Sequence, residues 1–189
     1  MTTVHQNLVV STKDSLLEMP RNFTGKPLKL CGERIVMFVD DSNLFYALRK
    51  IRVRKDLKIY QDLRNRLNVE DIYIYMSLNP ESETEKKLIR SLRRISFHVH
   101  AKPIVQRLDG TRKANLDVEI TWAMCSKADS YDVVILVSGD GDFCWAVKRL
   151  KQMGKCVVVV GLNSMTSPLL KNAANSYVDL ESLFDIKAS

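Results

Sequence analysis

Five aspartates begin or end regular stretches of this chain, and their placement suggests chemistry before any fold is considered. They are Asp40, Asp41, Asp117, Asp140 and Asp142. Two carboxylates about 4 Å apart repel by roughly 4 kcal/mol at an effective dielectric constant of about 20, so a group of them needs a cation or raised pKa values. Oxygen-only ligands favour magnesium or manganese (Mg²⁺ or Mn²⁺), and these ions assist phosphodiester hydrolysis. The first hypothesis is therefore a metal centre for phosphoryl chemistry.

Two of these acids follow the apolar run Val133–Val137, which predicts a strand buried on both faces of a parallel sheet. The small residues of the next segment, SGDGD, let the backbone turn tightly before a helix predicted over Phe143–Met153. In open α/β sheets, ligands bind beyond the carboxyl ends of the strands. Asp140 and Asp142 are therefore expected at a ligand site.

The other acids occupy comparable positions. Asp40 and Asp41 follow a strand predicted over Arg34–Val39, and Asp117 lies in the first turn of a predicted helix. Right-handed crossovers place the carboxyl ends of parallel strands along one edge of the sheet. The first and fourth strands are expected to be neighbours there, so Asp40 and Asp140 should lie close together.

Strand and helix patterns alternate along the chain, which predicts a three-layer α/β fold with a mainly parallel sheet. The remaining strands are predicted over Asp71–Met76, Phe97–Ala101, Cys156–Val160 and Tyr177–Leu180. Helices are predicted over Leu44–Ile51, from the capping residue Ser82 to about Arg94, from Leu116 to about Lys127, over Ser167–Ala174 and over Glu181–Ile186. A basic connection precedes the second strand, and Val105–Asn115 is expected to be a loop. Residues 1–30 are interpreted as a partly ordered arm and residues 31–189 as one domain.

Composition limits the compartment and the partners. No apolar run approaches the roughly 18–20 residues that span a bilayer, which predicts no membrane partner. The N-terminus lacks the basic leader and apolar core of a secretory signal, and the four cysteines lie far apart, as is typical of reduced thiols. These features predict a cytoplasmic location.

Basic residues are concentrated in two segments, residues 49–66 and 86–113, of a chain whose formal net charge is +7. Clustered cations attract phosphates and give salt-dependent binding. The candidates for binding a polyanion near the acids are Arg54, Arg94, Lys102, Arg112 and Lys113. Solvated helix faces and their loops would have the same composition, so composition leaves both interpretations open.

Helix capping is the competing interpretation for each acid taken alone. Asp41, Asp117 and Asp142 lie where an N-cap or first-turn acid is common. Asp140 stands between two glycines after a buried strand, and capping explains it less well. The combination of acids, more than any one of them, favours a metal site.

Three motifs resemble those of the NYN domain, a PIN-like nuclease group that includes the LabA-like proteins. They are FVDDSNL at residues 38–44, NLDV at residues 115–118 and LVSGDGDF at residues 136–143, of which the last is the most specific. The resemblance covers about residues 33–180. It implies a PIN-like Rossmannoid sheet of strand order 3-2-1-4-5 and a divalent-metal ribonuclease site.

Carried over by position, the resemblance assigns the catalytic and metal-binding acids as Asp40, Asp117, Asp140 and Asp142. Asn43 would orient the first acid or a metal-bound water, and Ser138 would support the turn. Asp41 would support the site beside Asp40, although the family usually has glycine there. Many relatives have a further acid where this chain has Ala123, and Glu119 lies on a different face of the helix.

The leading prediction is an enzyme, a metal-dependent ribonuclease that hydrolyses the phosphodiesters of single-stranded or structured RNA held by the basic candidates. The alternative is a catalytically weak or inactive RNA-binding or regulatory adaptor that retains the fold. Tyr46, Tyr60 and Phe97 could stack on bases, although such residues more often lie in cores. Two other phosphoryl classes fit poorly, because Ser42 replaces the second acid of a dehalogenase-like Asp-x-Asp and residues 40–45 contain no glycine for a dinucleotide-binding turn. A homodimer is left open.

Overall fold

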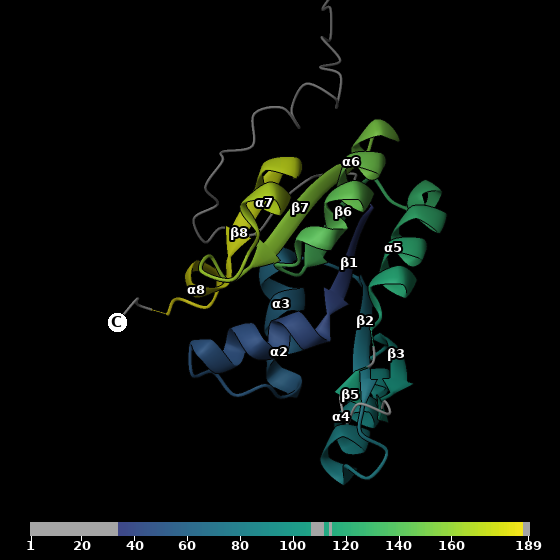
Figure 1. Ribbon diagram of the computed structural model, residues 1–189, viewed down its shortest axis with the longest axis vertical. Coiled ribbons are helices and arrows are strands. Elements are labelled where there is room, and N and C mark those ends of the chain that lie inside the picture. The colour runs from purple at the N-terminus through teal and green to yellow at the C-terminus, as the bar shows by residue number, and fades with distance from the viewer. Residues whose placement is uncertain (1–33, 107–111, 114, 187–189) are drawn as a thin grey trace, which may run out of the picture.

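The computed structural model describes residues 34–106, 112–113 and 115–186, and the predicted arm over residues 1–30 lies outside them. Figure 1 shows a central sheet with helices on both faces. The six strands are parallel and run in the order β3-β2-β1-β6-β7-β8. Their bounds are β1 Ile35–Asp40, β2 Asp71–Leu78, β3 His98–Pro103, β6 Val133–Val137, β7 Cys156–Gly161 and β8 Ser176–Asp179. Counted along the sheet strands this is 3-2-1-4-5-6, which confirms the predicted order and adds the last predicted strand at the edge.

The helices form two outer layers, because each buries an apolar face against the sheet. One layer contains α2 (Asp41–Lys50), α3 (Leu57–Leu67), α4 (Glu83–Arg94) and α8 (Leu180–Leu183), and the other contains α5 (Asp117–Ser126), α6 (Cys144–Gln152) and α7 (Pro168–Ala173). Two short 3₁₀ helices are η2 (Ala128–Ser130) and η3 (Gly141–Phe143). Alternate residues of β1 enter two apolar cores, Met37 and Val39 on one face and Val36 and Phe38 on the other. The predicted three-layer α/β fold is confirmed.

The prediction of a basic connection before the second strand is wrong, because this segment contains the helix α3. Asp56 caps the helix by accepting hydrogen bonds from the backbone N–H groups of Lys58 and Ile59. The apolar residues of α3 recur at helical spacing and are buried; they are Ile59, Tyr60, Leu63 and Leu67. The many cations of this segment led to its interpretation as a connection. The helical spacing of its apolar residues predicts the helix.

The expected loop at Val105–Asn115 begins and ends as a two-stranded ribbon. β4 (Val105–Gln106) pairs antiparallel with β5 (Arg112–Lys113), and residues 107–111 lie outside the described chain. The ribbon joins β3 to α5 and so returns the chain to the edge where the parallel strands end. Among the described helices, none has both the length and the apolar character needed to cross a membrane.

Candidate metal centre

The first acid lies where two neighbouring strands end. β1 and β6 are paired in the middle of the sheet, with Val39 opposite Val137, so Asp40 and Ser138 follow at the same edge. The Ser138 hydroxyl donates a hydrogen bond of 3.0 Å to Asp40 Oδ2. The Gly139 N–H donates one of 2.9 Å to Asn43 Oδ1. These two bonds join the turn after β6 to the start of α2, and they hold the first and third motifs together.

The acids divide into two that cap helices and three that lie in first turns. Asp40 Oδ1 accepts a hydrogen bond of 3.2 Å from the Asn43 N–H at the start of α2, and Asp140 Oδ1 accepts one of 3.0 Å from the Asp142 N–H at the start of η3. Asp41, Asp117 and Asp142 lie in the first turns of α2, α5 and η3, which confirms the positions expected from the sequence. Asp40 and Asp140 therefore each use one carboxylate oxygen for capping.

Three aspartates come together at this edge. One carboxylate oxygen from each of Asp117, Asp140 and Asp142 lies within 4.8 Å of the others, and the first two residues are partly buried. Oxygens bound to one magnesium ion at about 2.1 Å can be no more than about 4.2 Å apart. A small side-chain rotation or one intervening water would complete the set, so the donors fit a hard divalent cation. Asp40 is not one of these three, but it lies in the same cleft.

The cleft has a volume of about 610 Å³ and includes all four predicted metal ligands. It is lined by Asp40, Ser42, Asn43, Tyr46, Ser77, Ile104, Asn115, Leu116, Asp117, Asp140 and Asp142. The Tyr46 side chain is 57% exposed, whereas Tyr60 and Phe97 are buried in the core. Of the three aromatics considered from the sequence, Tyr46 therefore remains a candidate for contacting a base. None of the described lining residues is basic.

Burial raises the pKa of Asp40 to about 6. The residue is 8% exposed, and removal of its carboxyl group from water disfavours the charged form. Hydrogen bonds from Asn43 and Ser138 oppose the shift, while the negative charges of Asp117 and Asp41 add to it. A bound cation would lower the pKa of Asp40, because its positive charge favours the ionised carboxylate.

This shift predicts a pH-dependent stability for the metal-free protein. The folded state holds the Asp40 proton up to about pH 6, whereas the unfolded chain releases it near pH 4. The contribution of Asp40 to the free energy of unfolding in EDTA should therefore fall by about 2–3 kcal/mol as the pH rises from about 4 to 6. Urea unfolding of the wild type and of Asp40→Asn at several pH values measures this difference. Parallel pH profiles for the two proteins would contradict it.

Asp41 points into a buried network instead of the cleft. It is 4% exposed, and its Oδ2 atom lies 2.7 Å from Lys55 Nζ. The Tyr60 hydroxyl donates a hydrogen bond to its other oxygen. Lys55 and Tyr60 come from the segment interpreted as a connection, so sequence reasoning missed these partners. The contribution of Asp41 to the cleft is the electrostatic effect on Asp40 described above.

The predicted phosphate-binding residues are dispersed. Lys102 Nζ lies 2.5 Å from Glu119 Oε1 and 3.1 Å from the Asn115 carbonyl oxygen, beside the cleft. Arg54 is exposed in the connection between α2 and α3. Arg94 ends α4, which returns the chain to the opposite edge of the sheet. Arg112 and Lys113 form β5, and their side chains lie outside the described structure.

Ala123, at the position where many relatives have a further acid, is buried in the core beneath α5. A carboxylate at this position would lie on the apolar side of α5 and would not be available to a metal ion in the cleft. Glu119 forms an ion pair with Lys102, and this pairing lowers the pKa of the Glu119 carboxyl group. Neither residue adds a carboxylate to the three that come together.

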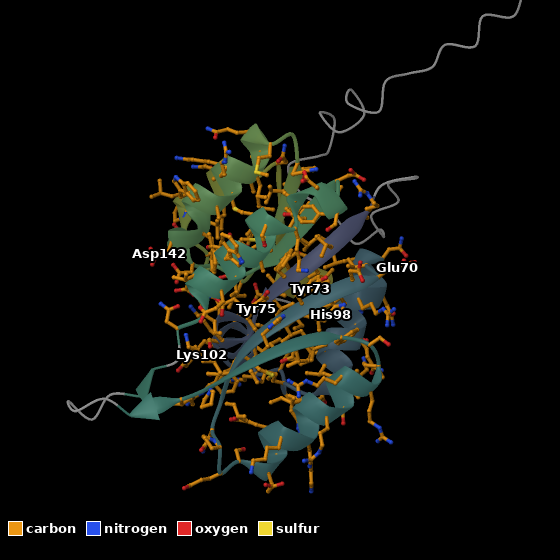
Figure 2. All side chains as sticks on the ribbon, turned by 90° about the vertical axis from the view of Figure 1, so that its right-hand side faces the viewer. Glu70, Tyr73, Tyr75, His98, Lys102 and Asp142 are labelled. Atoms are coloured by element: carbon orange, nitrogen blue, oxygen red, sulfur yellow. The ribbon has the colours of Figure 1, made fainter. Side chains whose placement is uncertain are left out.

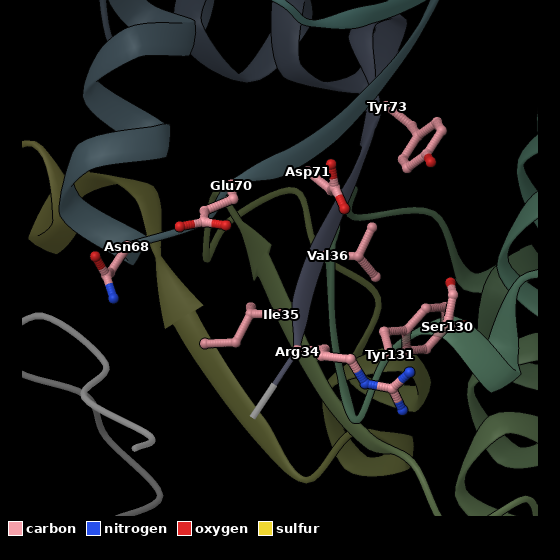
Figure 3. Close-up of a pocket in the computed structure, with 9 residues that line it drawn as sticks. All are labelled: Arg34, Ile35, Val36, Asn68, Glu70, Asp71, Tyr73, Ser130 and Tyr131. Carbon is pink, nitrogen blue, oxygen red and sulfur yellow. The ribbon is translucent and has the colours of Figure 1, made fainter. Parts of the chain in front are cut away.

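A second hollow lies at the opposite edge of the sheet, where β1 and β2 begin. Figure 3 shows it between Glu70, Asp71 and Tyr73 on one side and Ser130 and Tyr131 on the other. Arg34 at its rim pairs with Asp132 at 3.0 Å, so the cation there is already balanced. The converging acids at the carboxyl ends of the strands make the first cleft the better candidate for chemistry.

Comparison with known proteins identifies relatives that cover the sheet and the cleft. Residues 34–181 match the family model of the NYN domain. The chain is 29% identical over 160 residues to the Low amplitude and bright protein LabA of Synechococcus elongatus, covering 79% of this chain and 85% of that protein. The crystal structure of a protein of unknown function from Vibrio parahaemolyticus matches with a TM-score of 0.68 and 33% identity, covering 78% of this chain and 93% of that one. All four cleft aspartates lie within the matched residues.

Proposed function

The chain belongs to the NYN domain family, and on this premise we propose that it is a divalent-metal-dependent ribonuclease acting at the four-aspartate cleft. The proposed ion is Mg²⁺ or Mn²⁺, and the proposed partner is RNA, in the cytoplasm. The homodimer that the sequence leaves open is not part of this proposal. The observation that carries the proposal is the convergence of Asp117, Asp140 and Asp142 at the carboxyl ends of the central strands.

Each group around the cleft has a distinct part in this proposal. A divalent ion held by the acids would lower the pKa of a water molecule and polarise the phosphodiester. Asp117, Asp140 and Asp142 would supply its ligand oxygens. Asp40 holds a proton up to about pH 6 in the metal-free protein, and hydrogen bonds from the Ser138 hydroxyl and the Asn43 N–H orient its carboxyl group. Tyr46 offers an exposed ring at the mouth of the cleft, where a base could stack.

A second candidate function is a non-catalytic RNA-binding adaptor with the same fold. The lack of a basic residue among the described lining of the cleft favours it, because none of these side chains offers a cation to hold a phosphodiester.

Cleavage of labelled single-stranded RNA tests the two functions against each other. The nuclease proposal predicts cutting in Mn²⁺ that stops in EDTA and that Asp140→Asn removes, because the ion loses a ligand oxygen. Equal cutting by the wild type and Asp140→Asn would identify a contaminating nuclease and reject the proposal. RNA binding by both proteins without cutting by either would support the adaptor.

A further inference from the structure

No described helix covers the edge strand β3 on the face of the sheet that carries the cleft. The described helices of this face, α5, α6 and α7, pack over β1, β6 and β7 and bury Tyr75 of β2 in the same apolar cluster. On β2 and β3 the same face presents Tyr73 and Tyr75 beside His98 and His100. Figure 2 shows Tyr73, Tyr75 and His98 in front of the strands, with Lys102 farther along. Both histidines are exposed. We call the set Tyr73, Tyr75, His98 and His100 the ring platform.

The rings of the platform are stacked across neighbouring strands. Tyr73 and His98 have centroids 4.5 Å apart and an interplanar angle of 14°, and Tyr75 and His100 have values of 4.7 Å and 8°. Phe38 extends the first row into the core at 5.1 Å from Tyr73. Because a tyrosine covers one face of each imidazole, the other face and the ring edge are what solvent can reach. Each row therefore ends in an open aromatic surface at the edge of the sheet.

The platform is continuous with the metal cleft. Strand register places Asp40 opposite Tyr75 and Tyr75 opposite His100. Lys102 follows the histidines on the same face of β3, opposite Ser77, which lines the cleft. A strand that lies along β3 in this direction would therefore pass from the histidines to the acids.

The charge around the platform suits a polyanion. Lys127 Nζ lies 5.1 Å from the centroid of the Tyr73 ring. Arg93 lines a hollow of about 550 Å³ with both histidines, and two acids, Glu70 and Asp71, line it as well. Burial and the nearby charges of His98, Lys127 and Arg93 lower the pKa of His100. His100 is therefore a neutral ring at physiological pH, which favours stacking over ion pairing.

We infer that the ring platform binds two unpaired bases of single-stranded RNA and leads the strand into the cleft. This inference rests on the proposed ribonuclease function and specifies its substrate class. His98 and His100 lie about 7 Å apart along one face of β3, so each can take one base of an extended strand. Bases in a duplex already stack on each other at about 3.4 Å, and no ring can enter between them without unstacking.

The binding of fluorescein-labelled oligonucleotides in EDTA tests the inference without cleavage. His98→Ala with His100→Ala should weaken binding of a single strand of about twelve nucleotides by about 30-fold, and leave binding of the matching duplex unchanged. His98→Phe with His100→Phe keeps the stacking surface and should stay within about threefold of the wild type. Gln152→Ala with Met153→Ala removes two exposed uncharged side chains elsewhere and should change nothing.

Salt dependence separates stacking from phosphate binding. The double alanine variant should keep the wild-type slope of log Kd against log salt, whereas Lys127→Ala should reduce it by about 0.7. In Mn²⁺, the double alanine variant should cut a substrate of about four nucleotides as the wild type does, and it should cut the longer substrate no more efficiently than the short one.

Each contrary result has a definite meaning. A wild type that binds and cuts single-stranded RNA, with a double alanine variant that does the same, would overturn the inference and leave the proposed function standing. Failure of the phenylalanine variant to restore binding would also overturn it, because stacking would not be the cause. A wild type that neither binds nor cuts RNA would reject the proposed function and the inference together.

Discussion

Asp117→Asn is expected to lower Mn²⁺-dependent cleavage of RNA by about a thousandfold, or about 4 kcal/mol of transition-state stabilisation. Asp117 is the proposed ligand on α5, and one of its carboxylate oxygens lies within 4.8 Å of oxygens of Asp140 and Asp142, which the turn after β6 holds. An amide has no charge with which to balance the cation, so the affinity for Mn²⁺ should fall as well. Single-turnover cleavage rates and titration of Mn²⁺ by calorimetry measure both effects.

Two neighbouring substitutions are the controls for this prediction. Glu119→Gln, two residues along the same helix, removes a carboxylate that pairs with Lys102 and should change cleavage by no more than about threefold. Asp142→Asn should have a smaller effect than Asp117→Asn, because Asp142 is the exposed member of the three acids. Equal losses of cleavage for Glu119→Gln and Asp117→Asn would show that cleavage depends on the negative charge around the cleft and not on ligation of the ion by Asp117.

Lys55→Met is expected to destabilise the protein by about 3 kcal/mol, the largest effect on folding that we predict away from the apolar core. The side chains of Lys55 and Asp41 are 18% and 5% exposed, so the Asp41 carboxylate depends on this cation and on the Tyr60 hydroxyl. Removing the ammonium group leaves a buried charge with one neutral donor. Urea unfolding at pH 7 measures the change in the free energy of unfolding.

The chain contains a matched control for this pair. Lys58 forms an ion pair with Asp62 one turn away on α3, but its side chain is 74% exposed. Lys58→Met should therefore change the free energy of unfolding by less than about 0.5 kcal/mol. The double variant Asp41→Asn with Lys55→Met should recover part of the loss, because it removes both charges. Additive losses in the double variant would contradict a coupled pair.

The positions of the strands and of most helices follow from local patterns. The apolar run Val133–Val137 is β6 to the residue, and the capping box at Ser82 begins α4, with the Ser82 hydroxyl accepting a hydrogen bond from the Glu85 N–H. Buried strands need continuous apolar runs, and helix ends need polar caps, so both leave signals within a few residues. Helix α3 was not predicted, because the charged residues of its segment outweighed the helical spacing of its apolar residues in the interpretation.

Local patterns in the sequence therefore determined the strands and the edge at which the acids lie, and the resemblance of three motifs to the NYN domain implied the strand order. The tertiary structure alone decided which side chains meet there. Asp40 bonds to Ser138, 98 residues away, and Asp41 turns from the cleft to Lys55 and Tyr60. The ring platform is also a product of register, because Tyr73 meets His98 only when β2 and β3 pair. Local patterns record the burial and backbone needs of each segment, whereas a side chain's partner depends on packing between segments that are distant in the chain.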